Sequence, residues 1–402
     1  MNRVLTSMLR AGALALVVAV CAATPVFAAV LDADFIGGTR VADRPGLRAG
    51  APDLYVPSGV LATLDGRELW ARDPETRRAM ASTTKIMTAI VVLEQANLDE
   101  DVTVDRVAPT VGESGMGLIP GEVFTVRELL EGVLIQSGND AATMLAEHVG
   151  GTVPGFVKLM NAKAAQLDMP NTRYKNAHGL DVPGHYTSAE DLTTAARYAM
   201  RMPEFRRMVG TYKKKVRSDK YTHTLTSHNV LLKTYKGAEG IKTGWTDEAG
   251  YCVVVAAKRG QVELIGTIMG AASEGGRAAQ AKRLLDWGFA HYKPVTVVTV
   301  GEPAGRVRVS DYLERTVAAR TAETTTMPVF DLAGPLRRRI ELRADVPAPV
   351  KVGDTLGTMT VFQGDRMLVQ LPVVAAADVP VPTLWQRTVF FFTRLWRGIF
   401  GG

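Results

Sequence analysis

Cysteine is scarce in this chain, whose 402 residues include only Cys21 and Cys252. If residues 1–28 are removed as a signal peptide, as argued below, Cys252 has no partner for an internal disulfide. The six histidines show no metal-ligand spacing such as His-Glu-x-x-His. We therefore expect a protein that does not depend on disulfides and that contains no metal ion and no cofactor.

The apolar run near the N-terminus, residues 11–23, is shorter than the stretch of about 20 residues that a membrane-spanning helix needs. Arg3 and Arg10 precede this run, and residues 26–28 end in the small residue that signal peptidase prefers. We therefore expect residues 1–28 to be a secretory signal peptide and the mature protein to be exported.

Charge of either sign is not in large excess, because the formal net charge is only +6. Hydrophobic residues make up 47% of the chain and charged residues 22%, which is a globular composition with enough apolar residues for a sizeable core. The length favours two domains. The basic run at 213–220 is typical of a solvated surface, and no nucleic-acid-binding signature accompanies it. We expect no nucleic-acid partner.

Ser82-Thr-Thr-Lys85 is the first candidate catalytic motif. Residues three apart share one face of a helix, so the Ser82 hydroxyl and the Lys85 amine would lie side by side. Serine is a weak nucleophile without an adjacent base, and lysine acts as a base only where burial or a nearby cation lowers its pKa. The apolar run at 86–93 favours burial, although Ser-x-x-Lys also occurs on ordinary helices.

The second candidate is Ser137-Gly-Asn139, which lies between two predicted helices. Two interpretations remain open. Asn139 or Asp140 could simply cap the second helix, or Ser137 could relay a proton while Asn139 orients the lysine and a substrate amide. His178, in a loop at 176–186 rich in Gly and Pro, is equally open. It could be a catalytic base or could tie the loop together, as histidines often do.

Lys242-Thr243-Gly244 is the third candidate, and it precedes two predicted strands at 251–258 and 262–269. A lysine and a hydroxyl on a strand beside a glycine would make a carboxylate-binding edge, because the ammonium and hydroxyl donate and glycine permits close approach. The simpler interpretation is a strand start with a surface lysine.

Together these motifs resemble those of the serine penicillin-recognising enzymes, and they occur in that family's order. They are Ser82-x-x-Lys85, Ser137-x-Asn139 and Lys242-Thr243-Gly244. The Ser-Gly-Asn form of the middle motif, the loop at 178–181 and Trp245 after the third motif look like the D-alanyl-D-alanine carboxypeptidases, which are low-molecular-mass penicillin-binding proteins.

The resemblance implies an acyl-enzyme mechanism that removes the last residue of peptidoglycan pentapeptide stems ending in D-Ala-D-Ala. Ser82 would attack the carbonyl between the two D-alanines, and Lys85 would take its proton. Ser137 and Asn139 would pass the proton to the leaving D-alanine. β-Lactam antibiotics would acylate Ser82 in the same way and act as covalent inhibitors.

The resemblance also implies how the substrate is held. Lys242 and Thr243 would bind the terminal carboxylate beside Gly244, and the charge of Lys242 would keep the catalytic lysine neutral. The backbone N–H groups of Ser82 and Trp245 would form the oxyanion hole. His178 matches a loop histidine of some relatives and is a candidate substrate-binding residue.

The implied fold is an α/β (α+β) transpeptidase/β-lactamase-like domain over 45–293, with a central antiparallel sheet flanked by helices. A strand hairpin is predicted at 59–64 and 68–71, around an Asp-Gly turn. Helices are predicted from Ser82, at 127–135, at 141–146, from 187 and at 277–291.

From Pro294 onward the pattern changes to short alternating strands, which predict a small all-β sandwich domain at 294–380. In the family such a domain acts as a stalk. Residues 383–400 predict a C-terminal amphipathic helix, rich in Trp and Phe and carrying three arginines, which fits a helix lying on a membrane surface. We expect a peripheral protein on the periplasmic face of the cytoplasmic membrane.

Three other functions remain open at this point. A β-lactamase of the same fold needs a well-placed base for deacylation, and the loop region offers Glu190 and Asp191. A D,D-endopeptidase would cut cross-links with the same residues, and a non-catalytic wall-binding module would need none of them. A zinc peptidase is excluded by the histidine spacing. The sequence does not decide whether the chain forms a homodimer.

Overall fold

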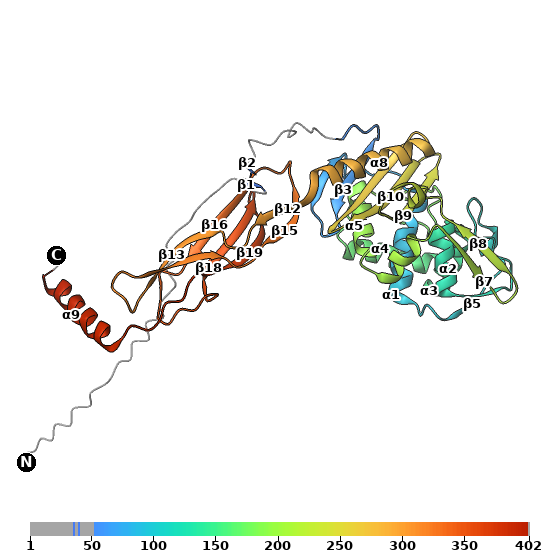
Figure 1. Cartoon of the computed structure of the whole chain (residues 1–402). Helices are drawn as coiled ribbons and strands as arrows, with labels where there is room; N and C mark the ends of the chain where they lie inside the picture. The colour runs from blue at the N-terminus through green and yellow to red at the C-terminus, as the bar shows by residue number, and fades with distance from the viewer. Residues whose placement is uncertain (1–34, 37–38, 41–51, 401–402) are drawn as a thin grey trace, which may run out of the picture. The chain divides into compact units, whose positions relative to one another are not determined.

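The computed structural model describes residues 35–36, 39–40 and 52–400, and the predicted signal peptide lies outside them. Two short strands near the start of the chain, β1 (Phe35–Ile36) and β2 (Thr39–Arg40), pair with each other. The rest forms two compact units (Figure 1). Of the described residues from 52 on, one unit contains 52–297 together with 326–335, and the other contains 298–325 and 336–400.

The first unit is built on a five-stranded sheet in which every pairing is antiparallel, as predicted. The spatial order is β4-β3-β11-β10-β9, so β9 forms an edge. The strands are β3 (Ser58–Thr63), β4 (Glu68–Arg72), β9 (Ala238–Thr246), β10 (Gly250–Arg259) and β11 (Val262–Ala271). The predicted hairpin and the predicted pair of central strands are therefore confirmed.

The central strands are buried on both faces, which explains why they are continuously apolar rather than alternating. Along β10, Val254 and Ala256 belong to one hydrophobic cluster, whereas Val253 and Val255 belong to another on the opposite face. Successive side chains of a strand point to opposite faces, so one strand contributes to both cores.

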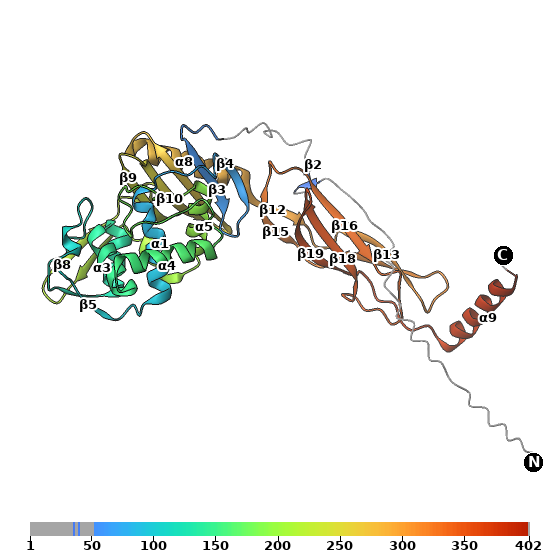
Figure 2. The same cartoon turned by 180° about the vertical axis from the view of Figure 1, so that it is seen from behind.

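Helices cover the two faces of this sheet (Figure 2). On one face lies α8 (Glu274–His291), whose Leu284 and Leu285 are buried against the sheet. On the other face, α5 (Ala189–Ala199) packs on β11, and α1 (Lys85–Gln95) packs on α5. The catalytic motifs lie on elements of this second layer and on the edge strand β9.

The remaining elements of the first unit are short. The helices are α2 (Val126–Glu131), α3 (Asn139–Gly150), α4 (Val153–Gln166), α6 (Pro203–Val209) and α7 (Leu231–Thr234). Three irregular helical turns are η2 (Ala81–Thr84), η3 (Ala108–Thr110) and η4 (Gly132–Gln136). Two small hairpins are β5 (Asp101–Thr103) with β6 (Val123–Thr125), and β7 (Lys213–Arg217) with β8 (Thr222–Thr226).

Three local expectations differ from the structure. The helix expected from Ser82 begins as the 3₁₀ turn η2 and becomes α-helical only at Lys85. The single helix expected at 127–135 is α2 followed by the π-helical turn η4, which ends where Ser137 adopts left-handed φ. Neither Asn139 nor Asp140 caps α3, because Gly138 occupies the N-cap position.

The second unit is β-rich, as predicted, and its six-stranded sheet has the order β16-β18-β19-β14-β13-β17. Only the β13–β17 pairing is parallel among the described pairings of this sheet. The strands are β13 (Pro303–Val309), β14 (Thr316–Thr321), β16 (Leu336–Leu342), β17 (Asp345–Val346), β18 (Thr355–Gln363) and β19 (Arg366–Ala375). A separate pair, β12 (Tyr292–Val298) with β15 (Thr325–Phe330), belongs to the first unit except for one residue of each strand.

The predicted C-terminal helix is confirmed as α9 (Leu384–Phe400). Its apolar side chains are exposed, with Trp385 75% and Trp396 65% accessible to solvent. Within the described part of the chain, no helix combines the length and apolarity that crossing a bilayer requires.

Candidate active site

The turn that carries Ser82 is compressed between two other segments. Ala81 has a left-handed φ of 50°. On one side, a Cβ on Gly244 of β9 would lie 2.8 Å from the Ser82 nitrogen. On the other, Gly179 has a φ of +98°, and a Cβ there would lie 2.0 Å from the Ala81 carbonyl oxygen. Since no real Cβ tolerates such distances, both positions require glycine, and their presence lets β9 and the 176–186 loop approach the turn.

A buried histidine, His185, supports the turn at 81–84 through Thr84. The Lys175 N–H donates to His185 Nδ1 at 3.0 Å, so the ring proton of the neutral imidazole is on Nε2. Nε2 therefore donates to Thr84 Oγ1 at 2.8 Å, and that hydroxyl donates to the Ala81 carbonyl at 2.8 Å. Burial lowers the pKa of His185 to about 4, which keeps the ring neutral around pH 7.

Lys85 is fully buried, and its Nζ lies among three oxygen atoms. It is 2.9 Å from Ser82 Oγ, 2.6 Å from Asn139 Oδ1 and 2.8 Å from the His178 carbonyl oxygen. Burial, and then the positive charge of Lys242, hold the pKa of Lys85 well below its usual value, while Asp140 acts in the opposite direction. The pair expected from the sequence is therefore adjacent, and its lysine has the perturbed pKa that a general base requires.

The Ser-Gly-Asn motif connects Lys85 to the segment at 112–118. The Asn139 side-chain amide donates to the Gly112 carbonyl at 2.8 Å, and the Asn139 backbone N–H donates to the Ser114 carbonyl at 2.7 Å. Ser137, with φ 66° and ψ 30°, has its side chain on the cavity. The motif thus positions an amide on the lysine and a hydroxyl beside Ser82, and it does not serve as a helix cap.

The next residue, Asp140, fixes the rest of this segment. Its carboxylate accepts backbone N–H bonds from Met116 at 2.9 Å, Gly117 at 2.9 Å and Leu118 at 3.1 Å. Asp140 itself is 3% exposed, so these bonds compensate the burial of its charge.

The edge strand β9 supplies the third motif. Lys242 is buried, and its Nζ donates to the Thr243 carbonyl at 2.9 Å. Burial, and then the charge of Arg277, lower the pKa of Lys242 to about 7. Thr243 and Gly244 line the cavity directly, and Trp245 is 47% exposed with its ring 5.8 Å from that of Tyr251.

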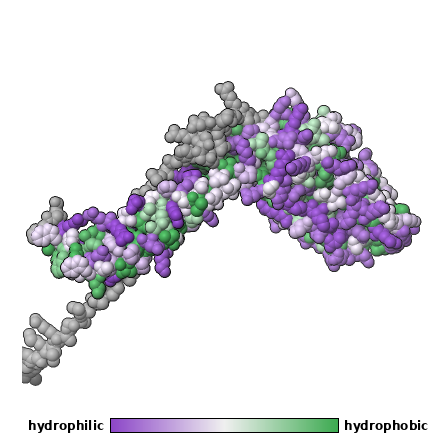
Figure 3. Space-filling view, in the orientation of Figure 1, coloured by the Kyte–Doolittle hydropathy of each residue, from purple (hydrophilic) through white to green (hydrophobic). Residues whose placement is uncertain are grey.

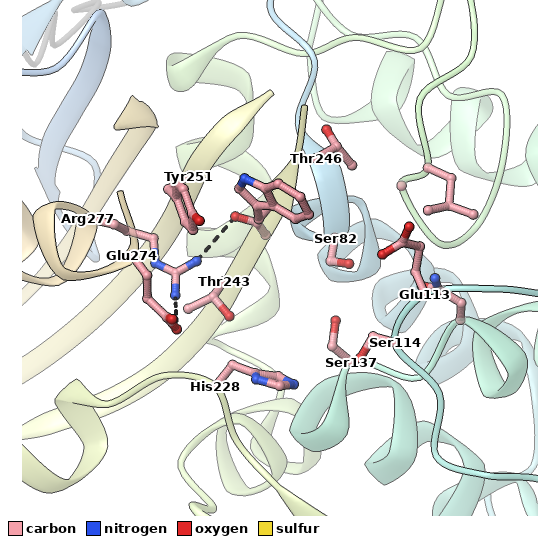
Figure 4. A pocket seen from close by; sticks show the side chains of 15 residues that line it. Ser82, Glu113, Ser114, Ser137, His228, Thr243, Thr246, Tyr251, Glu274 and Arg277 are labelled. Atoms are coloured by element: carbon pink, nitrogen blue, oxygen red, sulfur yellow. Dashed lines mark hydrogen bonds and ion pairs between the residues drawn. The ribbon is translucent and has the colours of Figure 1, made fainter. Parts of the chain in front are cut away.

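These elements enclose a cavity of about 300 Å³ (Figure 4). Its lining is polar and apolar in about equal parts, and Ser82 lies near its centre in this view. The lining residues are Ser82, Glu113, Ser114, Ser137, Asn139, Gly179, Leu180, His228, Thr243, Gly244, Trp245, Thr246, Tyr251, Glu274 and Arg277. Within the described residues, no group of three or more His, Cys, Asp and Glu side chains is arranged to hold a metal ion.

The His178 ring makes its hydrogen bond within the loop, in line with the structural role that the sequence left open. Its backbone carbonyl accepts from Lys85, and its ring Nδ1 accepts from the Leu180 N–H at 3.2 Å, which stabilises the loop. Its side chain is not among those that line the cavity. Burial, followed by the charge of Lys85, lowers the pKa of His178 to about 4.

The sequence did not single out Arg277, His228 or Glu113 as site residues. Arg277, near the start of α8, is 5% exposed and donates to the Gly244 carbonyl at 3.3 Å, while Glu274 pairs with it at 3.2 Å. His228 lines the cavity, and burial, followed by the charge of Lys242, lowers its pKa. None of these residues belongs to a short motif, so only their position beside β9 or the 112–118 segment indicates a role.

Comparison with known proteins places this site in a family. A family model described as D-alanyl-D-alanine carboxypeptidase (Peptidase_S11) matches residues 55–273, and one described as the C-terminal domain of penicillin-binding protein 5 matches 292–381. The chain is 33% identical over 366 residues to D-alanyl-D-alanine carboxypeptidase DacF of Bacillus subtilis, covering 88% of this chain and 94% of the relative. It is 28% identical to DacA of Escherichia coli K12, covering 88% and 90%.

Solved structures give the same result. The D-alanyl-D-alanine carboxypeptidase DacD from Francisella tularensis superposes with a TM-score of 0.62 at 25% identity, covering 85% of this chain and 98% of that one. Penicillin-binding protein 5 from Haemophilus influenzae gives a TM-score of 0.61 at 29% identity, covering 83% and 99%.

Proposed function

The chain belongs to the D-alanyl-D-alanine carboxypeptidases, serine peptidases of the S11 family, and we propose that Ser82 is its nucleophile and Lys85 its general base. The observation that carries this assignment is the environment of the Lys85 amine. It lies 2.9 Å from Ser82 Oγ, fully buried, with two carbonyl-type oxygens as its other partners.

Those two oxygens determine the direction in which the lone pair of the Lys85 amine points. Neither Asn139 Oδ1 nor the His178 carbonyl oxygen can donate, so each takes one N–H of the lysine. A neutral amine has two N–H bonds and one lone pair, and the lone pair is then directed at the Ser82 hydroxyl. The hydroxyl donates to it, and the proton moves to Nζ as Oγ attacks the carbonyl between the two D-alanines.

The neutral state of Lys85 is maintained by its surroundings. Burial penalises the ammonium, and the charge of Lys242 adds to this effect. After attack, the proton passes from Nζ through the Ser137 hydroxyl, which lines the cavity, to the nitrogen of the leaving D-alanine, while Asn139 Oδ1 holds Nζ in position.

The terminal carboxylate of the substrate binds at the β9 side of the cavity. Thr243 supplies a hydroxyl donor there, and Lys242 and Arg277 supply positive charge. The close approach of Gly244 to the Ser82 nitrogen supports an oxyanion hole made of the Ser82 and Trp245 backbone N–H groups. Loss of one such donor typically reduces the rate by ~10²–10³-fold.

Water releases the shortened peptide from Ser82, whereas a penicillin bound in the same way leaves a longer-lived acyl group. The sequence offered Glu190 and Asp191 as the base with which a β-lactamase would deacylate. Neither lines the cavity, and Asp191 accepts from Thr172 Oγ1 at 2.6 Å and from the Asn171 N–H at 2.8 Å. The carboxypeptidase is the activity that the family model and the curated relatives support.

We further propose that α9 attaches the exported protein to the outer surface of the cytoplasmic membrane, with the β-rich domain as a stalk. The helix carries three arginines and no acid, and its aromatic side chains are exposed. Apolar residues are visible at the α9 end of the chain, whereas hydrophilic residues cover most of the visible face of the first unit (Figure 3).

The other side of α9 is fixed to its own domain. Phe390, the one aromatic residue on the polar side of the helix, lies 5.8 Å from the Tyr312 ring, and Arg394 donates to the Ser310 carbonyl at 2.6 Å. Arg397 pairs with Glu314 at 3.3 Å. Trp385, Phe391 and Phe392 are exposed on the remaining faces, where they would enter the headgroup region of a bilayer.

A reporter penicillin tests the assignment of Ser82. The wild-type protein should become covalently labelled and should release D-alanine from a pentapeptide ending in D-Ala-D-Ala. Ser82→Ala should do neither, whereas Ser310→Ala in the second unit should behave like the wild type. Labelling of Ser82→Ala at the wild-type rate would overturn the assignment.

A further inference from the structure

The segment at 112–118 forms one wall of the cavity and is held at both ends. Asn139 binds the carbonyls of Gly112 and Ser114 with its side chain and its backbone, respectively. Asp140 binds three consecutive N–H groups at 116–118. Glu113 lies between these two carbonyls. Its backbone is therefore held by Asn139, the residue whose side chain also contacts Lys85.

Glu113 is the one charged residue of the segment at 112–118, and it is exposed. Its backbone has a left-handed φ of 69°, which is uncommon for residues other than glycine, asparagine and aspartate. Its side chain lines the cavity, and no hydrogen bond or ion pair of its carboxylate occurs among the described residues. The other acid of the lining, Glu274, is already paired with Arg277.

The charges of the cavity are thus separated. Arg277 and Thr243 enter from one side of Ser82, and Glu113 enters from the opposite side (Figure 4). A substrate whose carboxylate lies at the cationic side presents the rest of its chain toward Glu113. An extended residue advances about 3.3 Å, so the residue that precedes the D-Ala-D-Ala pair is the one whose side chain comes nearest to this wall.

We propose that the Glu113 carboxylate binds the side-chain ammonium of a diamino acid immediately before D-Ala-D-Ala. Glu113 thereby selects stems whose amine is free over stems in which that amine has been converted to an amide. This inference rests on the proposed function, because it takes Ser82 as the acylated residue and β9 as the carboxylate side. It names the substrate class of the same site and adds a specificity residue to it.

The expected preference is modest, because Glu113 is exposed. An exposed ion pair contributes about 0.2–1 kcal/mol, which corresponds to a preference of about 1.5- to 5-fold in kcat/KM. Screening shortens the range of such a pair from about 30 Å at 0.01 M salt to about 3 Å at 1 M. The preference should therefore fall toward unity as salt is added.

Two pentapeptides that differ only at one amine test the proposal. Both end in D-Ala-D-Ala and carry lysine before this pair, in one peptide with a free ε-amine and in the other with an acetylated ε-amine. The full-length wild-type protein should release D-alanine faster from the free amine, by the factor given above. Glu113→Gln should reduce that ratio to about one.

Glu248→Gln is the matched control, since Glu248 is exposed in the turn after β9 and does not line the cavity. It removes the same charge and should keep the wild-type ratio. Glu113→Lys should reverse the preference. It should favour a peptide whose lysine side chain has been succinylated, because that side chain then ends in a carboxylate.

The outcomes separate this proposal from the proposed function. If neither peptide releases D-alanine with the wild-type protein, the proposed function fails. If both are cleaved and Glu113→Gln leaves the ratio unchanged, or Glu248→Gln lowers it equally, Glu113 is not the specificity residue and the carboxypeptidase assignment stands.

Discussion

The role of Lys85 depends on atoms that its own motif does not contain. Ser-x-x-Lys places the amine near the hydroxyl, but the amine can accept the Ser82 proton only because two other oxygens occupy its N–H groups. One of them is a side-chain amide from the second motif. The other is a backbone carbonyl of the loop at 176–186, so the charge state and orientation of the base are set by three separate segments.

Lys242 should control the pH at which Lys85 works. Replacing Lys242 with glutamine removes a positive charge that lowers the pKa of Lys85, so that pKa should rise. Protonated Lys85 cannot take the Ser82 proton, and the acid limb of the acylation rate should therefore move to higher pH. We also expect kcat/KM for D-alanine release to fall by about 10- to 100-fold, the effect of losing a hydrogen bond to a charged group.

The second-order rate of labelling by a penicillin, measured against pH, checks this prediction. Lys213→Gln, which changes an exposed lysine of β7, should leave the acid limb of the pH profile at the same pH as in the wild type. An acid limb at the same pH in Lys242→Gln and in the wild type would contradict the proposed coupling.

At the residue scale, the sequence singled out residues that belong to short motifs and missed those that reach the cavity only through the fold. Ser82, Lys85 and Asn139 belong to such motifs, and the structure places their side chains in contact. The contribution of His178 through its carbonyl could not be found, since any residue there has a carbonyl. Arg277 and Glu113 reach the cavity only because β9 lies beside the start of α8 and because Asn139 binds the 112–114 segment.

At the scale of elements, the site is formed where an edge strand meets a helical turn. β9 pairs with β10 on one side only, and its other side approaches η2 so closely that Gly244 has no room for a side chain. The sequence predicted β10 and β11 because apolar runs bounded by turn residues are distinctive, whereas the start of a strand at Lys242 was inferred only from the motif before them. It did not predict the 3₁₀ turn at 81–84, because that turn is imposed by the contacts of Gly179 and Gly244.

Gly244→Ala should therefore separate the strand from the nucleophile without unfolding the protein. The added Cβ would lie 2.8 Å from the Ser82 nitrogen and 3.1 Å from the Thr83 nitrogen, so β9 must move outward. The oxyanion donors would be displaced, and we expect acylation to slow by about 10²–10³-fold. Stopped-flow labelling with a penicillin measures this rate.

Gly275→Ala is the control for that experiment. Gly275 lies in the first turn of α8, and a Cβ there meets nothing within 4 Å. Its acylation rate should match that of the wild type, and the melting temperatures of both variants establish that they are folded. A Gly244→Ala variant that is acylated at the wild-type rate would show that the close approach is not needed.

At the scale of the whole molecule, the cavity and the exposed aromatic helix are divided between the two units. The cavity is lined entirely by residues of the first unit, and the exposed aromatic residues of α9 belong to the second. The proportion of charged and apolar residues predicted a globular chain, and the length predicted two domains. It could not show that Phe390 packs on Tyr312, because that contact joins two positions far apart in the sequence.

Removal of two tryptophans from α9 should abolish attachment and leave catalysis intact. Trp385 and Trp396 are both largely exposed, and burial of each is worth about 1.5–3 kcal/mol, so the double change to serine should weaken binding to anionic vesicles by about 100-fold or more. Sedimentation with vesicles measures the binding. Tyr221→Ser, at an exposed aromatic residue of the first unit, should bind like the wild type, and all variants should label equally with penicillin.

The double use of Asn139 has a consequence for inhibition. One amide group is shared between the proton acceptor and the wall of the binding cleft, so the shape of that wall and the readiness of the base cannot vary independently. A compound that draws residues 112–114 outward would take this amide with it and leave the amine disoriented. Such a compound would inhibit the enzyme by binding at the edge of the cavity, without a reactive ring and without forming a covalent bond to Ser82.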